Sequence, residues 1–288
     1  MSATSPANEK LIRNISDTAR WVAVYRARET ERKHPLFRDP FARRLAGDRG
    51  EQIAKAMPMQ GKGEWPFVMR TFLFDEVITN QLQQGVETVI NLAAGLDTRP
   101  YRMPLQHTIK WYEIDLPEIL DYKEEILKNE TPRCSLERIR LDLSDVPARR
   151  AVFEELGRKS KVTLILTEGL LAYLDPEQVG LLGRDLTVPP SFQRWVNDFG
   201  SPGLMRMLQK RMGPHLDAAN APFKFAPAEG PDFFRPHGWK PVDVHSLLKA
   251  AARFNRLPLF LRLMAFLPES NGKQGSAPWS AVCLFDRV

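Results

Sequence analysis

The sequence predicts an α/β protein built on a doubly wound, mostly parallel β-sheet. Three observations carry this prediction: 43% of the 288 residues are hydrophobic, short apolar runs alternate with helical patterns after residue 85, and polar residues follow several of those runs. Strands that alternate with helices are typical of parallel sheets joined by crossover helices. A chain of this length can bury a full core as one large domain, or as a domain with an appended lobe.

The N-terminal third of the chain predicts helices. Between residues 17 and 47, apolar residues such as Trp21 and Tyr25 recur at helical spacing until prolines interrupt the pattern. A second helical pattern covers residues 67–84, and Gly85 supplies its stop. We therefore expect residues 1–84 to form a helical cap on the core.

The remaining elements follow in an alternating order. Strands are predicted over residues 88–92, 110–114, 135–141, 162–167, 192–199, 239–244 and 278–285. Helices are predicted over residues 116–129, 148–159, 204–212 and 246–254, and another begins after the N-cap Asp175, with a polar turn at 270–276. These elements divide the chain into an α/β core over 85–200, an acceptor-side lid over 201–238, and a C-terminal part of the core over 239–288.

Polar residues stand where ligands bind in such a sheet, just beyond the carboxyl ends of the strands. Gly95 in the first strand-end loop lets backbone approach a ligand, and Asp115, 20 positions later, can accept hydrogen bonds from ribose hydroxyls. Asp142 and Glu168 follow the third and fourth strands. Each also has a structural reading: a plain turn at Gly95, helix caps at Asp115 and Asp142, and a solvated carboxylate at Glu168.

A nicotinamide-dependent oxidoreductase is the main competing class for this pattern. Its phosphate loop needs G-x-G-x-x-G, whereas residues 91–99 supply one glycine, with Ala93 and Thr98 at the other two positions. Asp97 also places a negative charge near the position of a pyrophosphate. A donor without phosphate and with a sulfonium centre fits better, and S-adenosylmethionine is such a donor.

Three strand-end strings carry a family resemblance. Asn91-Leu-Ala-Ala-Gly-Leu-Asp-Thr-Arg99, Trp111-Tyr-Glu-Ile-Asp-Leu-Pro117 and Thr167-Glu-Gly-Leu-Leu-Ala-Tyr-Leu174 closely resemble the bacterial branch of the leucine carboxyl methyltransferase-like family of class I S-adenosylmethionine-dependent methyltransferases. Segments at 16–21, 26–29, 39–42 and 70–71 also look like that branch. The resemblance implies a Rossmann-like fold with an antiparallel C-terminal strand and a helical lid.

The resemblance also implies roles for residues along the donor. Asn91, Ala93 and Gly95 would lie against its methionine part, Asp115 and Leu116 against ribose, Asp142 and Leu143 against adenine, Glu168 near the reaction centre, and Arg70 at its carboxylate. Arg20, or alternatively Arg28, would reach the donor from the first helix. Ala93 departs from the glycine of many methyltransferases, and alanine resists positive φ, so either a slightly different loop or weaker donor binding is expected.

The acceptor and any general base are less well specified. Tyr173 and His237 are the candidate catalytic residues, although a carboxylate acceptor would need no base. The phenylalanines at 223, 225, 233 and 234 predict either an apolar acceptor pocket or the core of the lobe. By analogy with the family we expect O-methylation of a carboxylate or hydroxyl on a small molecule of secondary metabolism, with a protein carboxyl terminus as another acceptor. A donor-binding protein without catalysis is a further alternative.

Composition excludes several other classes. The sequence has no apolar stretch of about 20 residues and no signal-peptide pattern, which predicts a cytoplasmic protein. Its two cysteines, Cys134 and Cys283, resemble neither a disulfide framework nor a metal site. The net charge of +6 comes from basic residues interleaved with acidic ones, which argues against nucleic acid as a partner.

Overall fold

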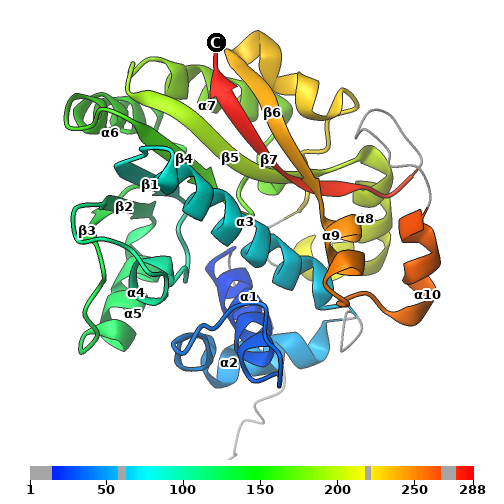
Figure 1. Ribbon diagram of the computed structural model, residues 1–288. Helices are drawn as coiled ribbons and strands as arrows, with labels where there is room; N and C mark the ends of the chain where they lie inside the picture. The colour runs from blue at the N-terminus through cyan, green and yellow to red at the C-terminus, as the bar shows by residue number, and fades with distance from the viewer. Residues whose placement is uncertain (1–14, 58–62, 218–221, 267–276) are drawn as a thin grey trace, which may run out of the picture.

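The computed structural model describes residues 15–57, 63–217, 222–266 and 277–288, and its centre is a seven-stranded sheet of order β3-β2-β1-β4-β5-β7-β6 (Figure 1). Strands β1 to β5 are parallel, and β7 runs antiparallel between β5 and β6. The strands are β1 (Thr88–Leu92), β2 (Lys110–Asp115), β3 (Ser135–Arg140), β4 (Thr163–Thr167), β5 (Phe192–Gly200), β6 (Trp239–Ser246) and β7 (Ser280–Arg287). The predicted doubly wound sheet with an antiparallel C-terminal strand is confirmed. The polar turn predicted at 270–276 lies outside the described residues.

Helices cover both faces of this sheet (Figure 1). They are α1 (Ile15–Thr30), α2 (Ala42–Ala56), α3 (Trp65–Gln83), α4 (Arg99–Arg102), α5 (Pro117–Leu127), α6 (Val146–Arg158), α7 (Pro176–Thr187), α8 (Pro202–Asp217), α9 (Leu247–Arg253) and α10 (Leu259–Arg262), with 3-10 turns η1 (Leu171–Tyr173), η2 (Gly230–His237) and η3 (Leu263–Phe266). α6, α7 and η2 share one apolar core with the sheet, and α3 and α9 share another on the opposite face. None of the helices in the described ranges combines the length and apolarity needed to cross a bilayer.

The burial of the central strands explains why the sheet could be predicted from the sequence. Every residue of β1 and β4 is buried, as expected for parallel strands covered on both faces. The start of α7 could also be predicted from the sequence, because Asp175 and Gln178 form a reciprocal capping box and Pro176 occupies the first turn.

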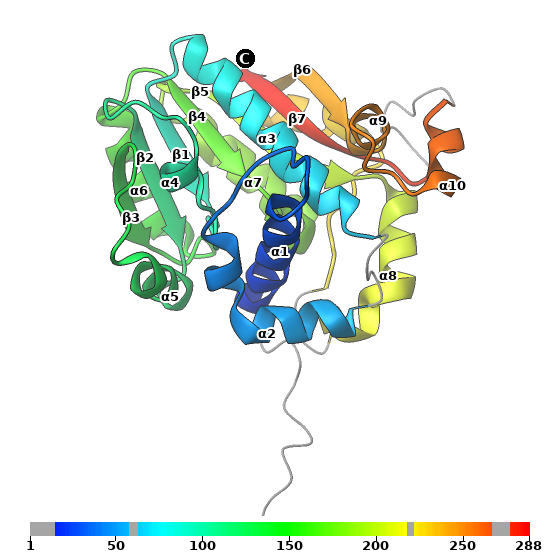
Figure 2. The same ribbon diagram turned by 60° about the horizontal axis from the view of Figure 1, so that its bottom comes forward.

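The N-terminal helices pack as a pair against the open side of the core. α1 and α2 lie side by side (Figure 2). They share a third apolar cluster that includes Trp21 and Leu45 and continues to α5. α2 is kinked at Gly47, where φ is +58°, a conformation that favours glycine. This packing brings α1 alongside the loop that follows β1. The distance between them is short, since a Cβ added to Gly95 would lie 3.4 Å from the Cβ of Ala19.

Candidate functional site

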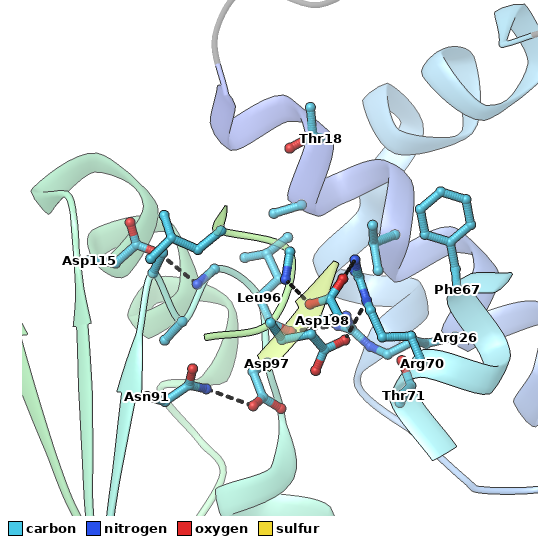
Figure 3. A pocket seen from close by; sticks show the side chains of 18 of the residues that line it. Thr18, Arg26, Phe67, Arg70, Thr71, Asn91, Leu96, Asp97, Asp115 and Asp198 are labelled. Carbon is cyan, nitrogen blue, oxygen red and sulfur yellow. Dashed lines mark hydrogen bonds and ion pairs between the residues drawn. The ribbon is translucent and has the colours of Figure 1, made fainter. Parts of the chain in front are cut away.

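A cavity of about 200 Å³ lies beyond the carboxyl ends of β1, β2, β4 and β5, between those strand ends and helices α1 and α3 (Figure 3). Six of the sequence-predicted site residues line it: Arg70, Asn91, Ala93, Gly95, Asp115 and Glu168. Tyr173, one of the two predicted catalytic residues, lines it as well. The structure thus brings residues separated by about a hundred positions in the chain into one site.

The loop after β1 turns sharply through two left-handed residues. Ala93 has φ of +53° and Gly95 has φ of +49°. Alanine therefore does not force a different loop, since Ala93 adopts the conformation that glycine takes at no steric cost. The backbone N–H of Gly95 donates to Oδ2 of Asp115 at 2.6 Å, which joins the first and second strand ends.

The carboxylate of Asp115 accepts hydrogen bonds from neighbouring backbone N–H groups and does not cap helix α5. Its Oδ1 accepts from the N–H of Leu116 at 2.7 Å, and the N-cap residue of α5 is Leu116, which makes no side-chain capping bond. Burial raises the pKa of Asp115, although the N–H groups of Gly95 and Leu116 oppose that rise. Two backbone donors thus orient a carboxylate that lines the cavity.

Arg99 holds the centre of a buried ion cluster. Its Nε and Nη1 contact Asp75 and Asp97 at 2.7 and 2.8 Å, and its Nη2 lies 2.8 Å from Oε2 of Glu168. Asn91 donates from Nδ2 to Oδ2 of Asp97 at 2.8 Å, the same oxygen that Nη1 of Arg99 contacts (Figure 3). Burial acts to raise the pKa of Asp97, but Arg99 and neighbouring cations outweigh it and hold that pKa below its usual value. Arg99 neutralises the charge of Asp97, so this charge no longer disfavours a pyrophosphate. The single glycine of the loop is the remaining observation against a pyrophosphate.

Arg70 connects the ends of β4 and β5. Its Nε donates to Glu168 at 3.1 Å and its Nη1 to Oδ2 of Asp198 at 3.2 Å, while Oδ1 of Asp198 accepts from the N–H of Gly169 at 2.6 Å. Burial acts to raise the pKa of Glu168, but Arg99 and Arg70 outweigh it and lower that pKa. Burial raises the pKa of Asp198, with Arg70 and Gly169 opposing. Two carboxylates of different basicity therefore share one guanidinium.

Several predicted residues lie elsewhere. Asp142 is exposed beyond the edge strand β3, where it accepts from the N–H of Ser144, and it is Asp145 that caps α6. Leu143 packs against the apolar core on the α6 side, and Leu116 packs in the cluster of α1, α2 and α5.

His237 lies on the α7 side of the sheet and does not line the cavity. Its Nδ1 is 2.9 Å from Arg184, and its ring packs 5.2 Å from that of Phe233. Burial and the charge of Arg184 lower its pKa. Among the four phenylalanines of the lobe, Phe223 lines the cavity, whereas Phe225 and Phe234 are buried in the core.

The two arginines suggested from the first helix are engaged outside the cavity. Arg20 stacks 3.7 Å over the ring of Tyr122, and Arg28 pairs with Glu51 and Glu64. Arg26 lines the cavity instead, with its Nη2 on the carbonyl of Leu96. No role in the site was predicted from the sequence for Asp198, Arg26, Arg99 or Arg102, all of which line the cavity. The signals for the first two were a carboxylate near the fifth strand end and a charge on the first helix.

Known proteins resemble this chain over most of its length. A sequence profile of the leucine carboxyl methyltransferase family matches residues 19–187, more than half of the chain. A protein of Mycobacteroides abscessus is 29% identical over 89% of this chain and 92% of its own length, and one of Streptomyces avermitilis is 30% identical over 83% and 87%. Both carry the name "Putative S-adenosyl-L-methionine-dependent methyltransferase", with a further suffix in the second case.

Solved structures agree with the fold. A DUF574 family protein of Streptomyces avermitilis superposes with a TM-score of 0.60 at 15% identity, covering 92% of this chain and 96% of that one. A protein of Thermobifida fusca described as a "putative methyltransferase" superposes with a TM-score of 0.58 at 12% identity, covering 100% and 99%. The chain belongs to the leucine carboxyl methyltransferase family of S-adenosylmethionine-dependent methyltransferases.

Proposed function

We propose that this protein transfers the methyl group of S-adenosylmethionine to an oxygen atom of a small molecule, and that the donor lies along the strand ends in the order β3, β2, β1. The observation that carries the proposal is the junction of Gly95 with Asp115, where one strand-end loop exposes backbone and the next presents a fixed carboxylate. Such a junction suits a ligand with a ribose and no phosphate.

Each part of the donor has a partner in this proposal. The carboxylate of Asp115 accepts from the ribose hydroxyls, and Ala93 and Gly95 lie against the methionine portion. Arg70, which lines the cavity beside Glu168, binds the donor carboxylate. Adenine extends toward Asp142 and Leu143 at the next strand end, where the surface is open. The cavity of about 200 Å³ is smaller than sites that enclose a complete small ligand, which are roughly 300 to 1,000 Å³. Its size therefore agrees with an adenine that lies outside it.

The protein's contribution to the reaction is positioning. Transfer from a sulfonium is an in-line displacement, so the site must align an acceptor oxygen with the methyl carbon and keep water out. The donor supplies the methyl group and a neutral thioether leaving group. Helix α1 covers the cavity with Thr18, Trp21 and Val22, and Phe223 adds an apolar surface between α8 and η2. We propose these segments as the acceptor-side cap, with Tyr173 rather than His237 facing the acceptor.

Calorimetric titration tests the donor assignment. S-adenosylhomocysteine, the reaction product, is expected to bind to the full chain with a stoichiometry of one, whereas NADH, the probe for the oxidoreductase alternative, is expected to give no heat of binding. Binding of NADH in place of S-adenosylhomocysteine would refute the proposal. Binding of S-adenosylhomocysteine without transfer to any acceptor would favour a donor-binding protein without catalysis.

A further inference from the structure

We propose that Asp198 is the general base of the reaction and that the acceptor is an aromatic hydroxyl. This inference rests on the proposed function and deepens it by naming the acceptor class. The sheet order places the strand ends in the sequence β3, β2, β1, β4, β5. If the donor occupies the first three ends, its reactive methyl faces the last two, and these present Glu168 and Asp198 to the cavity.

Asp198 is held in place by two donors. Its Oδ1 accepts from the N–H of Gly169 at 2.6 Å, and its Oδ2 accepts from Nη1 of Arg70 at the long distance of 3.2 Å. The side chain is 16% exposed and lines the cavity, as Figure 3 shows beside Arg70. Oδ2 is thus a carboxylate oxygen with only one long contact, and it retains acceptor capacity for a further hydrogen bond.

Glu168 is less suited to accept a proton. Both of its oxygens are engaged, Oε1 by Arg70 and Oε2 by Arg99. Those cations favour its ionised form, whereas burial makes Asp198 the more basic of the two carboxyl groups. A base that works near neutral pH benefits from such a raised pKa.

The charges of the cavity disfavour a carboxylate acceptor. Four arginines line it, Arg26, Arg70, Arg99 and Arg102, and among the described residues each has a carboxylate partner. Arg70 is also the proposed partner of the donor carboxylate, so an acceptor carboxylate would be a second added anion beside Asp198 and Glu168 with no further cation to neutralise it, and like charges in a buried site repel. A neutral hydroxyl group carries no such penalty.

Four aromatic side chains line the same cavity as these carboxylates. Trp21 of α1 and Phe67 of α3 lie with ring centroids 5.0 Å apart, and Tyr173 lies 5.5 Å from Phe223, all four lining the cavity. Edge-to-face and tilted packing at such distances is the geometry in which aromatic rings attract one another. A planar aromatic acceptor gains these contacts, and its ring places the hydroxyl toward Asp198.

The proposed step transfers one methyl group to the acceptor and one proton to Asp198. The acceptor oxygen forms a bond to the methyl carbon with its lone pair while the carbon–sulfur bond breaks, and that electron pair stays on sulfur as a thioether. The proton of the acceptor hydroxyl passes to Oδ2 of Asp198, which is deprotonated by solvent after the product leaves. The step consumes no oxidant or reductant.

Transfer of tritium from S-adenosyl-[methyl-³H]methionine to simple phenols tests the inference. The acceptors are 4-methoxyphenol, phenol and 4-nitrophenol, in order of increasing acidity, with benzoate as the carboxylate. Wild type is expected to methylate the phenols and not benzoate. Asp198→Asn is expected to lower kcat toward 4-methoxyphenol by roughly 100- to 10,000-fold, the usual contribution of a general base. The loss should shrink strongly for 4-nitrophenol, which ionises without help.

Controls separate this role from a structural one. Asp243→Asn, at an exposed β6 carboxylate paired with His245, is expected to leave all rates unchanged. Asp198→Asn should keep the melting temperature and the S-adenosylhomocysteine affinity of wild type. Equal loss for all phenols, a matching loss of product affinity, or an unfolded variant would overturn the general-base role. Should wild type bind S-adenosylhomocysteine yet methylate benzoate or no phenol, the acceptor class is wrong while the proposed function stands. If S-adenosylhomocysteine does not bind, the proposed function itself fails.

Discussion

Removing the guanidinium of Arg99 should destabilise the whole site. Arg99→Met keeps the length of the side chain but leaves Asp75, Asp97 and Glu168 facing one another in a region where Arg99 is only 3% exposed. Breaking a buried ion pair by removing one partner costs about 3 to 5 kcal/mol, because a charge stays buried without compensation. Asp75 keeps Arg102 and Glu168 keeps Arg70, so we expect the lower half of this range.

Urea unfolding at neutral pH, followed by tryptophan fluorescence, measures this cost. Arg140→Met is the matched control, since Arg140 pairs with Asp121 and Glu124 at the surface and its loss should change the free energy of unfolding by less than about 1 kcal/mol. Because Arg99 lowers the pKa of Asp97, the stability that this pair contributes is present above the unfolded pKa of about 4 and is lost as the pH falls through the lower folded pKa. The difference between wild type and Arg99→Met should therefore narrow in acid. An Arg99→Met protein as stable as Arg140→Met would refute the reasoning.

Three further predictions follow from the same geometry. Asp115→Ala should weaken S-adenosylhomocysteine binding by about 1.5 to 3 kcal/mol in calorimetry, while equal losses in Asp115→Ala and the exposed Asp243→Ala would contradict a specific ribose contact. Ala93→Gly should change the free energy of unfolding by less than about 1 kcal/mol, because relief of a left-handed alanine is offset by glycine's backbone entropy, and a large urea-measured loss would show that Ala93 is not strained. Cys134, whose pKa burial raises to about 12, and the buried Cys283 should react with a thiol reagent only after unfolding, so rapid labelling of the native protein would count against the packing.

The sheet could be predicted from the sequence because its strands are buried on both faces. β1 was predicted over its full observed range, since five consecutive apolar or small polar residues end at a polar loop. β6 was predicted too short, because its last residues, His245 and Ser246, are polar but pair with Val282 and Ala281 of β7. Pairing across the sheet therefore overrides local composition at an edge strand.

The site could be predicted only where the strand ends were correctly placed. Asn91 and Asp115 lie in the last residues of β1 and β2, Gly95 and Glu168 follow β1 and β4, and the structure gathers all four in one cavity. Asp198 was missed because it falls inside the predicted fifth strand, whose final residues pair with β7 beyond the end of β4.

Arg26 was missed for a different reason. It stands in a run of alternating charges that is typical of a solvated helix face, yet its partner Asp39 lies 13 positions later and both are buried. Only the return of the chain between α1 and α2 brings that partner close, and such a contact leaves no local pattern. His237 was predicted because of its aromatic neighbours. It packs against one of them, Phe233, on the α7 side of the sheet and away from the cavity.

A crystal structure of the protein with S-adenosylhomocysteine tests the central claim most directly, namely the order of the donor along the strand ends. We expect ribose hydroxyls within hydrogen-bonding distance of Asp115, the donor carboxylate on Arg70, and the sulfur directed toward Asp198. A ligand whose ribose lies away from Asp115, or whose sulfur faces the β3 edge of the sheet, would contradict it.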